Sequence, residues 1–232
     1  MKPVYLVAAL LLFLAACNKD KIDELPTEIS KLQPIKNLAD TLDHILAENG
    51  NVIDKDPVLF SDTIQKNIIL SKASRVFVTF VDEETSKKNT LGWYAYPYAK
   101  PPASTSDVDA KILFPNISKV GEGGLLESGF TVQLGTETFP AGTVIGFFIV
   151  ANGWDNGTIN LDRPIYYTNY NLNPNGDQLH VLFKNAYSNY IVVGFEDNLS
   201  AGRDFNDLLF AVSDNNEGLE STSFDLSNMF IR

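Results

Sequence analysis

An acidic segment between two apolar runs constrains the fold of this chain more than any other feature. The segment extends from Gly194 to Asp207 and lies between the apolar runs 190–193 and 208–212. Two short apolar runs separated by a polar turn are typical of buried antiparallel strands joined as a hairpin. The sequence therefore predicts a β-hairpin whose connection is rich in side-chain oxygen atoms.

Five side chains of this segment carry acceptor oxygens, and Arg203 alone offers a compensating positive charge. The five residues are Glu196, Asp197, Asp204, Asn206 and Asp207. Neighbouring carboxylates repel one another, and Ca²⁺ relieves the repulsion because it takes about 6 to 8 oxygen ligands. Mg²⁺ fits less well, because it binds few protein ligands and retains water. We expect a calcium site, while a solvated turn with Asp and Asn bonded to their own backbone stays open.

The motif Phe195-Glu196-Asp197, followed by Asp204-Phe205-Asn206-Asp207, resembles the signature of the LruC-type family, a bacterial extracellular domain family of unknown function. Similar blocks occur in the same order upstream, at 78–83, 89–94, 114–116, 123–125 and 142–147. The resemblance covers roughly residues 58 to 214. It implies a β-rich, calcium-binding module with Glu83 as a further candidate ligand, and it implies no known reaction.

Residues 1–16 have the features of a secretion signal, with Lys2, an apolar run at 4–14 and small residues at 15–16. The run is too short for a permanent membrane span. Cys17, the only cysteine of the chain, follows directly, and Leu14-Ala15-Ala16-Cys17 is similar to a lipobox. We therefore expect lipidation of Cys17 and an outer membrane lipoprotein, which the charged residues 18–21 favour for display on the cell surface.

The charge of the chain limits its partners. The formal net charge is -11, and loss of Lys2 with the signal peptide makes it about -12. Such an excess of negative charge argues against nucleic acid or anionic lipid as a partner. With its single cysteine lipidated, the chain forms no disulfide, so stability is expected from the core or from a metal.

From about residue 68, side chains alternate with a period of two, which indicates β-strands. Roughly ten such strands are separated by turns such as Asn152-Gly153, Asn156-Gly157 and Asn175-Gly176. The run 144–151 is apolar on both faces and is expected to be a central strand. The prediction is an all-β fold, an antiparallel β-sandwich of jelly-roll type over residues 58–214, with a short helical N-terminal tether.

The segments before and after the sandwich lack this alternation. Residues 17–57 are expected to form a lipid-anchored tether that is dispensable for folding, and residues 215–232 a polar tail that adds an edge strand or lies over the sandwich. His44 is expected on the polar side of a short helix, which packs on the domain or spaces it from the membrane. The apolar side of that helix comprises Ile35, Leu38, Leu42, Ile45 and Leu46.

The sequence offers little support for an enzyme, which needs a nucleophile, an acid-base pair or an activated metal water in a pocket. His180 is expected on the outer surface of a strand, so a Ser-His-Asp arrangement is not favoured. A glycoside hydrolase would use Glu196 or Asp197 as acid and Asp204 or Asp207 as base, but their crowding in one loop suits a cation better.

Aromatic residues suggest an alternative, a carbohydrate-binding module. Trp93, Tyr94, Tyr96 and Tyr98 form one cluster, Tyr166, Tyr167 and Tyr170 form another, and Trp154 lies in a turn. Aromatic residues at this spacing are usually half-buried strand residues, so this reading needs exposed rings. The expected function is a non-enzymatic, calcium-stabilised surface lipoprotein module for extracellular binding or adhesion, with a glycan or a protein as ligand.

Overall fold

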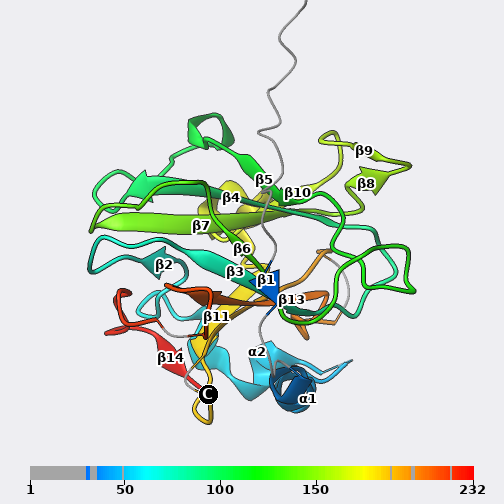
Figure 1. Ribbon diagram of the computed structural model, residues 1–232, viewed down its shortest axis with the longest axis horizontal. Coiled ribbons are helices and arrows are strands. Elements are labelled where there is room, and N and C mark those ends of the chain that lie inside the picture. The colour runs from blue at the N-terminus through cyan, green and yellow to red at the C-terminus, as the bar shows by residue number, and fades with distance from the viewer. Residues whose placement is uncertain (1–29, 32–35, 49, 189, 200–201, 220) are drawn as a thin grey trace, which may run out of the picture.

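The computed structural model describes residues 30–31, 36–48, 50–188, 190–199, 202–219 and 221–232. Over these residues the chain is built mainly from β-strands in two sheets (Figure 1). The larger sheet comprises β1 (Ser30–Lys31), β3 (Phe77–Asp82), β6 (Phe130–Gln133), β11 (His180–Lys184), β12 (Ile191–Phe195), β13 (Leu208–Ser213) and β14 (Phe230–Ile231). The smaller sheet comprises β2 (Ile68–Ile69), β4 (Thr90–Pro97), β5 (Lys111–Phe114), β7 (Thr143–Val150) and β10 (Ile165–Tyr167).

The larger sheet has the order β1-β6-β3-β13-β12-β11-β14, and the smaller has the order β10-β7-β4-β5 with β2 paired to β7. Strand pairs within both sheets are antiparallel, except that β14 runs parallel to β11. A separate ribbon pairs β8 (Trp154–Asp155) with β9 (Thr158–Ile159). The predicted all-β class is confirmed, whereas the jelly-roll type stays a prediction.

The helical elements are short. They are α1 (Lys36–Ile45), α2 (Val52–Lys55) and the 3-10 turns η1 (Pro57–Phe60), η2 (Thr105–Asp107), η3 (Tyr170–Leu172) and η4 (Pro174–Gly176). None of the helices in the described part of the chain is long and apolar enough to cross a membrane. The predicted signal peptide (1–16) and the predicted lipidation residue Cys17 lie outside the described residues.

The main hydrophobic core lies between the two sheets. Side chains from β3, β12 and β13 of the larger sheet meet side chains from β4 and β7 of the smaller sheet in one buried cluster. At its centre the rings of Phe147 and Phe210 pack edge to face, with centroids 4.8 Å apart. Alternation within each strand therefore sends one set of side chains to this core, as the period of two in the sequence predicts.

Both faces of β7 are buried, as its uninterrupted apolar sequence predicts. Ile145, Phe147 and Ile149 face the main core. Phe148 and Val150 enter a small third cluster with Tyr94 and Tyr167 on the outer side of the smaller sheet. β7 is thus a central strand covered on both sides.

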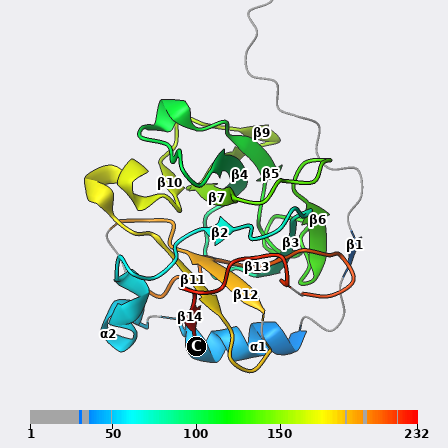
Figure 2. The same ribbon diagram turned by 90° about the vertical axis from the view of Figure 1, so that its left-hand side faces the viewer.

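Helices α1 and α2 lie along the outer face of the larger sheet (Figure 2), and their apolar side chains form a second core against it. Leu38, Leu42 and Leu46 of the α1 segment are buried there against Val181 and Phe183 of β11. The remaining members come from the segment after α1, from β3, β12 and β13 and from two loops, namely Val52, Leu59, Val81, Val192, Phe205, Leu209, Ala211 and Leu219. Helix α1 thus packs on the domain, and His44 is exposed on its outer side.

One expectation about a surface position needs correction. His180 is fully buried, because both faces of β11 are covered, and its Nε2 lies 2.8 Å from the carbonyl oxygen of Lys66. The expected surface position was therefore wrong. Of the two positions expected for the tail, the structure shows the edge strand, since β14 pairs with β11, and Phe224 and Met229 belong to the main core.

Candidate functional site

The acidic segment connects β12 to β13, which pair in antiparallel register from Ile191 opposite Val212 to Phe195 opposite Leu208. The predicted hairpin is therefore confirmed. Gly194 allows a close approach, because a Cβ there would lie 2.4 Å from the carbonyl oxygen of Phe205. Phe205 itself has a φ of 60° and is fully buried, which turns the backbone before β13.

Phe205 anchors this turn in the second core. Its ring lies 5.4 Å from the ring of Phe60, between centroids. A positive φ is unfavourable for a bulky residue, so the buried contacts must hold it in place. The chain after Gly202 is thereby folded back, and Asp204, Asn206 and Asp207 are placed near the end of β12.

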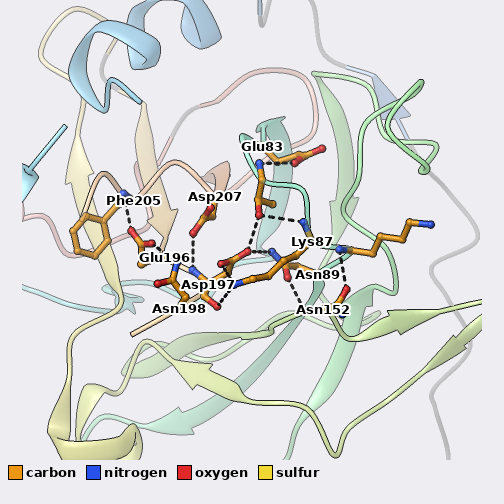
Figure 3. A network of polar contacts seen from close by, with 11 residues as sticks. Glu83, Lys87, Asn89, Asn152, Glu196, Asp197, Asn198, Phe205 and Asp207 are labelled. Atoms are coloured by element: carbon orange, nitrogen blue, oxygen red, sulfur yellow. Dashed lines mark hydrogen bonds and ion pairs between the residues drawn. The ribbon is translucent and has the colours of Figure 1, made fainter. Parts of the chain in front are cut away.

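Asp197 is held in a compensated polar network (Figure 3). Lys87 Nζ lies 2.5 Å from its Oδ1, and Asn89 Nδ2 and Thr85 Oγ1 each donate to Oδ2 at 2.8 Å. Burial alone would raise the pKa of Asp197, but the hydrogen bonds from Asn89, Lys87 and Thr85 outweigh it and hold the pKa below its usual range. Asp197 is therefore ionised and already supplied with donors.

Glu196 and Asp207 form a different kind of pair. Burial, followed by the charges of Asp207 and Asp204, raises the pKa of Glu196 to about 9. Burial and the charge of Asp197 raise the pKa of Asp207 to about 7. Near neutral pH the pair therefore retains a proton, because two neighbouring carboxylates, one buried and one half-buried, cannot both ionise at ordinary cost.

The remaining contacts of the pair come from the hairpin backbone and from Asn198. Glu196 Oε1 accepts from Asn198 Nδ2 at 3.0 Å, and Oε2 lies 3.5 Å from the backbone nitrogen of Phe205. Asp207 Oδ2 accepts from the backbone N–H of Asp197 at 2.7 Å. Figure 3 shows Glu196 beside Phe205 and Asn198, and the Asp207 carboxylate directed at the Asp197 backbone nitrogen.

Asn206 reaches the N-terminal segment rather than this acidic pair. Its Nδ2 donates to the carbonyl oxygen of Leu46 at 3.2 Å and to Glu48 Oε2 at 3.1 Å. Its Oδ1 is buried and has no hydrogen-bond partner among the described residues. The hairpin and the end of α1 are thus joined through one side chain.

Arg203 does not neutralise the Glu196–Asp207 pair. Its Nη1 donates to the carbonyl oxygen of Gln178 at 3.2 Å, and its Nη2 lies 4.0 Å from Asp177 Oδ1. The charge that does compensate an acid of the segment comes from Lys87, in the connection between β3 and β4. The hairpin therefore keeps its excess of acidic side chains.

Glu83 has a structural role at the end of β3. It is buried, and its two oxygens accept from the backbone N–H groups of Lys119 at 3.1 Å and Thr85 at 3.2 Å. Burial raises its pKa. Glu83 is linked to Asp197 through Thr85, so the structure brings it to the same network without a direct contact.

Sequence reasoning did not identify Lys87, Asn89, Asn152 and Glu48 as partners of the acidic segment. Asn89 is fully buried, and its Oδ1 accepts from the backbone N–H of Asn152 at 2.7 Å. The sequence signal for Asn89 was its position as a polar residue directly before the apolar run of β4. Asn89 also lies in the block 89–94, which resembles the LruC-type family.

The donor atoms around the hairpin are oxygens, the type that Ca²⁺ prefers. As placed, however, no group of three or more His, Cys, Asp or Glu side chains within the described residues is arranged to hold a metal ion. The ligand chemistry of the predicted site therefore fits calcium, while its acidic side chains do not converge on one point in this conformation.

Comparison with protein families gives a match. A family model with the description "Domain of unknown function (DUF4114)" matches residues 139–215, which include β7 to β13 and the whole acidic hairpin. No curated protein and no solved structure matches the chain. Over about a third of its length the chain is thus similar to a family whose function is unknown, and the LruC-type resemblance stays a prediction.

Proposed function

We propose that the β12–β13 hairpin binds Ca²⁺ and that the protein is a non-enzymatic, calcium-stabilised β-sandwich of jelly-roll type for extracellular binding or adhesion. The observation that carries this proposal is the pair formed by the buried Glu196 and the half-buried Asp207, whose carboxyl pKa values are raised to about 9 and about 7. Such a pair retains a proton, which reduces the repulsion between its two carboxylates. A bound cation would reduce the same repulsion.

Calcium would replace that proton and draw the acidic side chains together. The ligands would be Glu196, Asp204 and Asp207, with the buried Oδ1 of Asn206 as a neutral oxygen donor. Asp197 would support the site from beside it, because its oxygens already accept from Lys87, Asn89 and Thr85. Binding would require the acidic side chains to move closer together, because no three of them in the described part of the chain are placed to hold an ion together.

Calorimetric titration of the detergent-solubilised full chain with CaCl₂ tests this proposal. We expect uptake of about one calcium ion, with release of protons near pH 7.5, because ligands must be deprotonated before they bind a metal. Repeating the titration in two buffers of different ionisation enthalpy measures the protons released. Asp207→Asn and Glu196→Gln should abolish most of the uptake, and the exposed Asp162→Asn should not. Calcium uptake without proton release, or equal uptake by all variants, would contradict the proposed ligands.

The location of the protein is proposed from its first residues. We infer an outer membrane lipoprotein anchored through Cys17 and displayed at the cell surface, on the strength of the lipobox-like sequence alone. Cys17→Ser should abolish labelling with a radioactive fatty acid and remove the mature protein from the membrane fraction. Protease treatment of intact cells then tests surface display, because complete protection behind an intact outer membrane would place the domain on the inner side.

The ligand of such a module is a protein or a glycan. Of these, the carbohydrate-binding alternative has a specific observation in its favour, a pocket lined by two tyrosine rings. The glycoside hydrolase alternative has less support, because the acids of the hairpin lie on one turn and Asp197 is committed to Lys87. A binding role therefore remains the proposal.

A further inference from the structure

A pocket of about 480 Å³ lies at the end of the smaller sheet where β4 finishes and β7 begins. Its wall combines two tyrosine rings with amide and carboxylate side chains, including Tyr96, Tyr98, Gln65, Asn67, Asp62 and Asp225. Residues from β4, from the segment around β2 and from the tail meet here although they are far apart in sequence. A concave site with a few fixed polar groups is the usual form of a small-molecule site.

The exposed aromatic surface of this region belongs to the pocket. Trp93 and Tyr94 are buried in the cores, as the ordinary strand interpretation predicts. Tyr96 is half-buried, and Tyr98 is 65% exposed. Tyr96 and Tyr98 of the first aromatic cluster thus place two rings at a pocket, instead of three rings on a flat surface. This arrangement suits a short ligand or the end of a polymeric ligand rather than the surface of a long polymer.

The Tyr96 ring is held in place before any ligand arrives. Its hydroxyl donates to Asn169 Oδ1 at 3.2 Å and accepts from Asn169 Nδ2 at 3.0 Å. On its inner side the ring stacks on Tyr94, with centroids 6.1 Å apart and an interplanar angle of 17°. A fixed ring loses little conformational entropy when a ligand packs against it, which favours binding.

The polar groups of the pocket are also fixed by hydrogen bonds. Gln65 is 9% exposed, its Nε2 donates to the carbonyl oxygen of Asn67 at 2.8 Å, and its backbone N–H donates to the carbonyl oxygen of Asn228 at 2.9 Å. Asp62 accepts from the hydroxyl of Tyr170 at 3.0 Å. Asp225 Oδ1 accepts from the Ser227 backbone and hydroxyl, which leaves Asp225 oriented by its own turn.

The charges of the pocket select the class of ligand. Lys66 lines it, but its Nζ donates to the carbonyl oxygen of Leu59 at 2.5 Å. Asp62 and Asp225 are therefore the charges best placed to meet a ligand, and the chain as a whole carries a net charge of -11. Acidic ligands are repelled by this field, whereas neutral hydroxyl groups can donate to carboxylate and amide oxygens.

We propose that this pocket binds a neutral saccharide of one or two rings, with a sugar ring packed against Tyr96 and Tyr98. The apolar face of a sugar ring matches an aromatic ring, and its hydroxyls match the side chains of Gln65, Asp62 and Asp225. This inference names the ligand for the proposed extracellular binding role, and it does not depend on calcium. Along β4 and β7, the pocket and the Asp197 network lie at opposite ends, since Pro97 pairs with Thr143 and Thr90 with Val150.

The test is a titration of the detergent-solubilised full chain with cellobiose, maltose, mannobiose, chitobiose and, as an acidic comparison, digalacturonic acid. We expect at least one neutral disaccharide to bind, and digalacturonic acid to bind at least about tenfold more weakly. Tyr98→Ala should weaken the neutral binding about tenfold or more, because it removes the exposed ring. Tyr187→Ala is the matched control, since Tyr187 is 87% exposed and does not line the pocket.

The titration is run in CaCl₂ and in EDTA, which separates this inference from the calcium proposal. Neutral binding that is lost in Tyr98→Ala supports the pocket, whether or not the chain takes up calcium. The inference is wrong if none of the neutral disaccharides binds, if digalacturonic acid binds best, or if Tyr98→Ala and Tyr187→Ala behave alike. A chain that binds sugar but no calcium would refute the metal site and leave the pocket in place.

Discussion

Asn89 joins the strand connections that surround the hairpin. Its Nδ2 donates to Asp197 Oδ2 at 2.8 Å and its Oδ1 accepts from the Asn152 backbone N–H at 2.7 Å. Asn89→Ala would remove a donor from a buried carboxylate and leave a backbone N–H without its partner, and each such loss costs about 1–3 kcal/mol. We expect the free energy of unfolding in urea titrations to fall by about 2–4 kcal/mol.

The control for this change is the exposed Asn228, where replacement by alanine should alter the free energy of unfolding by less than about 0.5 kcal/mol. Equal losses for the two variants would show that the Asp197 network does not depend on Asn89.

His180 predicts a pH dependence of stability. Burial lowers its pKa to about 3, whereas a histidine in the unfolded chain titrates near 6.5. Between these values the unfolded state binds the proton and the folded state does not. The contribution of His180 is therefore complete above about pH 6.5 and is lost as the pH falls toward 3, at up to about 1.4 kcal/mol per pH unit.

The measurement is the free energy of unfolding from pH 4 to pH 7 for the wild type, His180→Gln and His44→Gln. The His180 variant should show a shallower fall toward low pH, while the variant of the exposed His44 should follow the wild type. The Glu196–Asp207 pair has the opposite sign, because its raised pKa values stabilise the protonated folded state, so only the difference between variants isolates His180. Parallel profiles for all three proteins would contradict the buried neutral histidine.

At the scale of elements, Gly194 shapes the hairpin through a close approach of its two arms. A Cβ at this position would lie 2.4 Å from the Phe205 carbonyl oxygen, and backbone atoms cannot move away as freely as a side chain. Gly194→Ala should therefore lower the free energy of unfolding by about 1–3 kcal/mol, measured by urea titration. In Gly202→Ala the nearest atom, Asp204 Oδ2, would lie 3.8 Å from the new Cβ, so this variant of the same hairpin should lose much less. Equal losses of unfolding free energy for Gly194→Ala and Gly202→Ala would contradict a tight contact between Gly194 and the Phe205 carbonyl.

Helix α1 packs into the second core, while the dispensability of residues 17–57 for folding stays a prediction. Leu42 is fully buried in the second core with Val181 and Phe183. Leu42→Ala should lower the free energy of unfolding by about 2–4 kcal/mol, because it removes buried methyl groups and leaves a cavity. The exposed Asp40→Ala on the same helix should change it by less than about 0.5 kcal/mol. A negligible loss of unfolding free energy in Leu42→Ala would support the prediction that residues 17–57 are only a tether.

For the molecule as a whole, the parts that were predictable from sequence are those governed by local pattern. The hairpin of β12 and β13, the doubly buried β7 and the helix with its apolar side all follow from periodicity within a few residues. The expected position of His180 failed because a strand pattern does not reveal which elements cover its second face. His180 lies on the same face of β11 as Leu182 of the main core, where its ring packs beside Phe195 and the segment around Lys66 covers it.

The candidate site was predictable in its residues but not in their partners. Lys87 meets Asp197 across 110 positions of sequence, and Asn206 meets Glu48 across 158. Such contacts depend on how the two sheets and α1 pack, and no spacing within the acidic segment encodes them. For the same reason, the sequence of the acidic segment did not distinguish Asp197, whose charge Lys87 compensates, from the Glu196–Asp207 pair, whose carboxyl pKa values are raised. The five side chains look alike in sequence.

The pocket is also a property of the whole molecule. Tyr96 and Tyr98 were visible as neighbours on one strand, but Gln65 and Asp225 join them only because β2 pairs with β7 and the tail returns beside it. The ordinary strand interpretation holds for Tyr94, whose ring is buried. The exposed ring of Tyr98 is what the sequence alone did not distinguish.

The most direct test of calcium stabilisation is the melting temperature of the full chain in CaCl₂ compared with that in EDTA. Binding to the folded state alone gives about 2.7 kcal/mol at a hundredfold excess of calcium over its dissociation constant, which corresponds to a rise of about 5–10 °C for a chain of this size. Asp207→Ala should lose most of this rise, and Asp162→Ala, at an exposed position outside the hairpin, should keep it. Equal melting temperatures of the wild type in CaCl₂ and in EDTA would contradict a calcium-stabilised fold and leave the acidic hairpin as a turn stabilised by its own protons and hydrogen bonds.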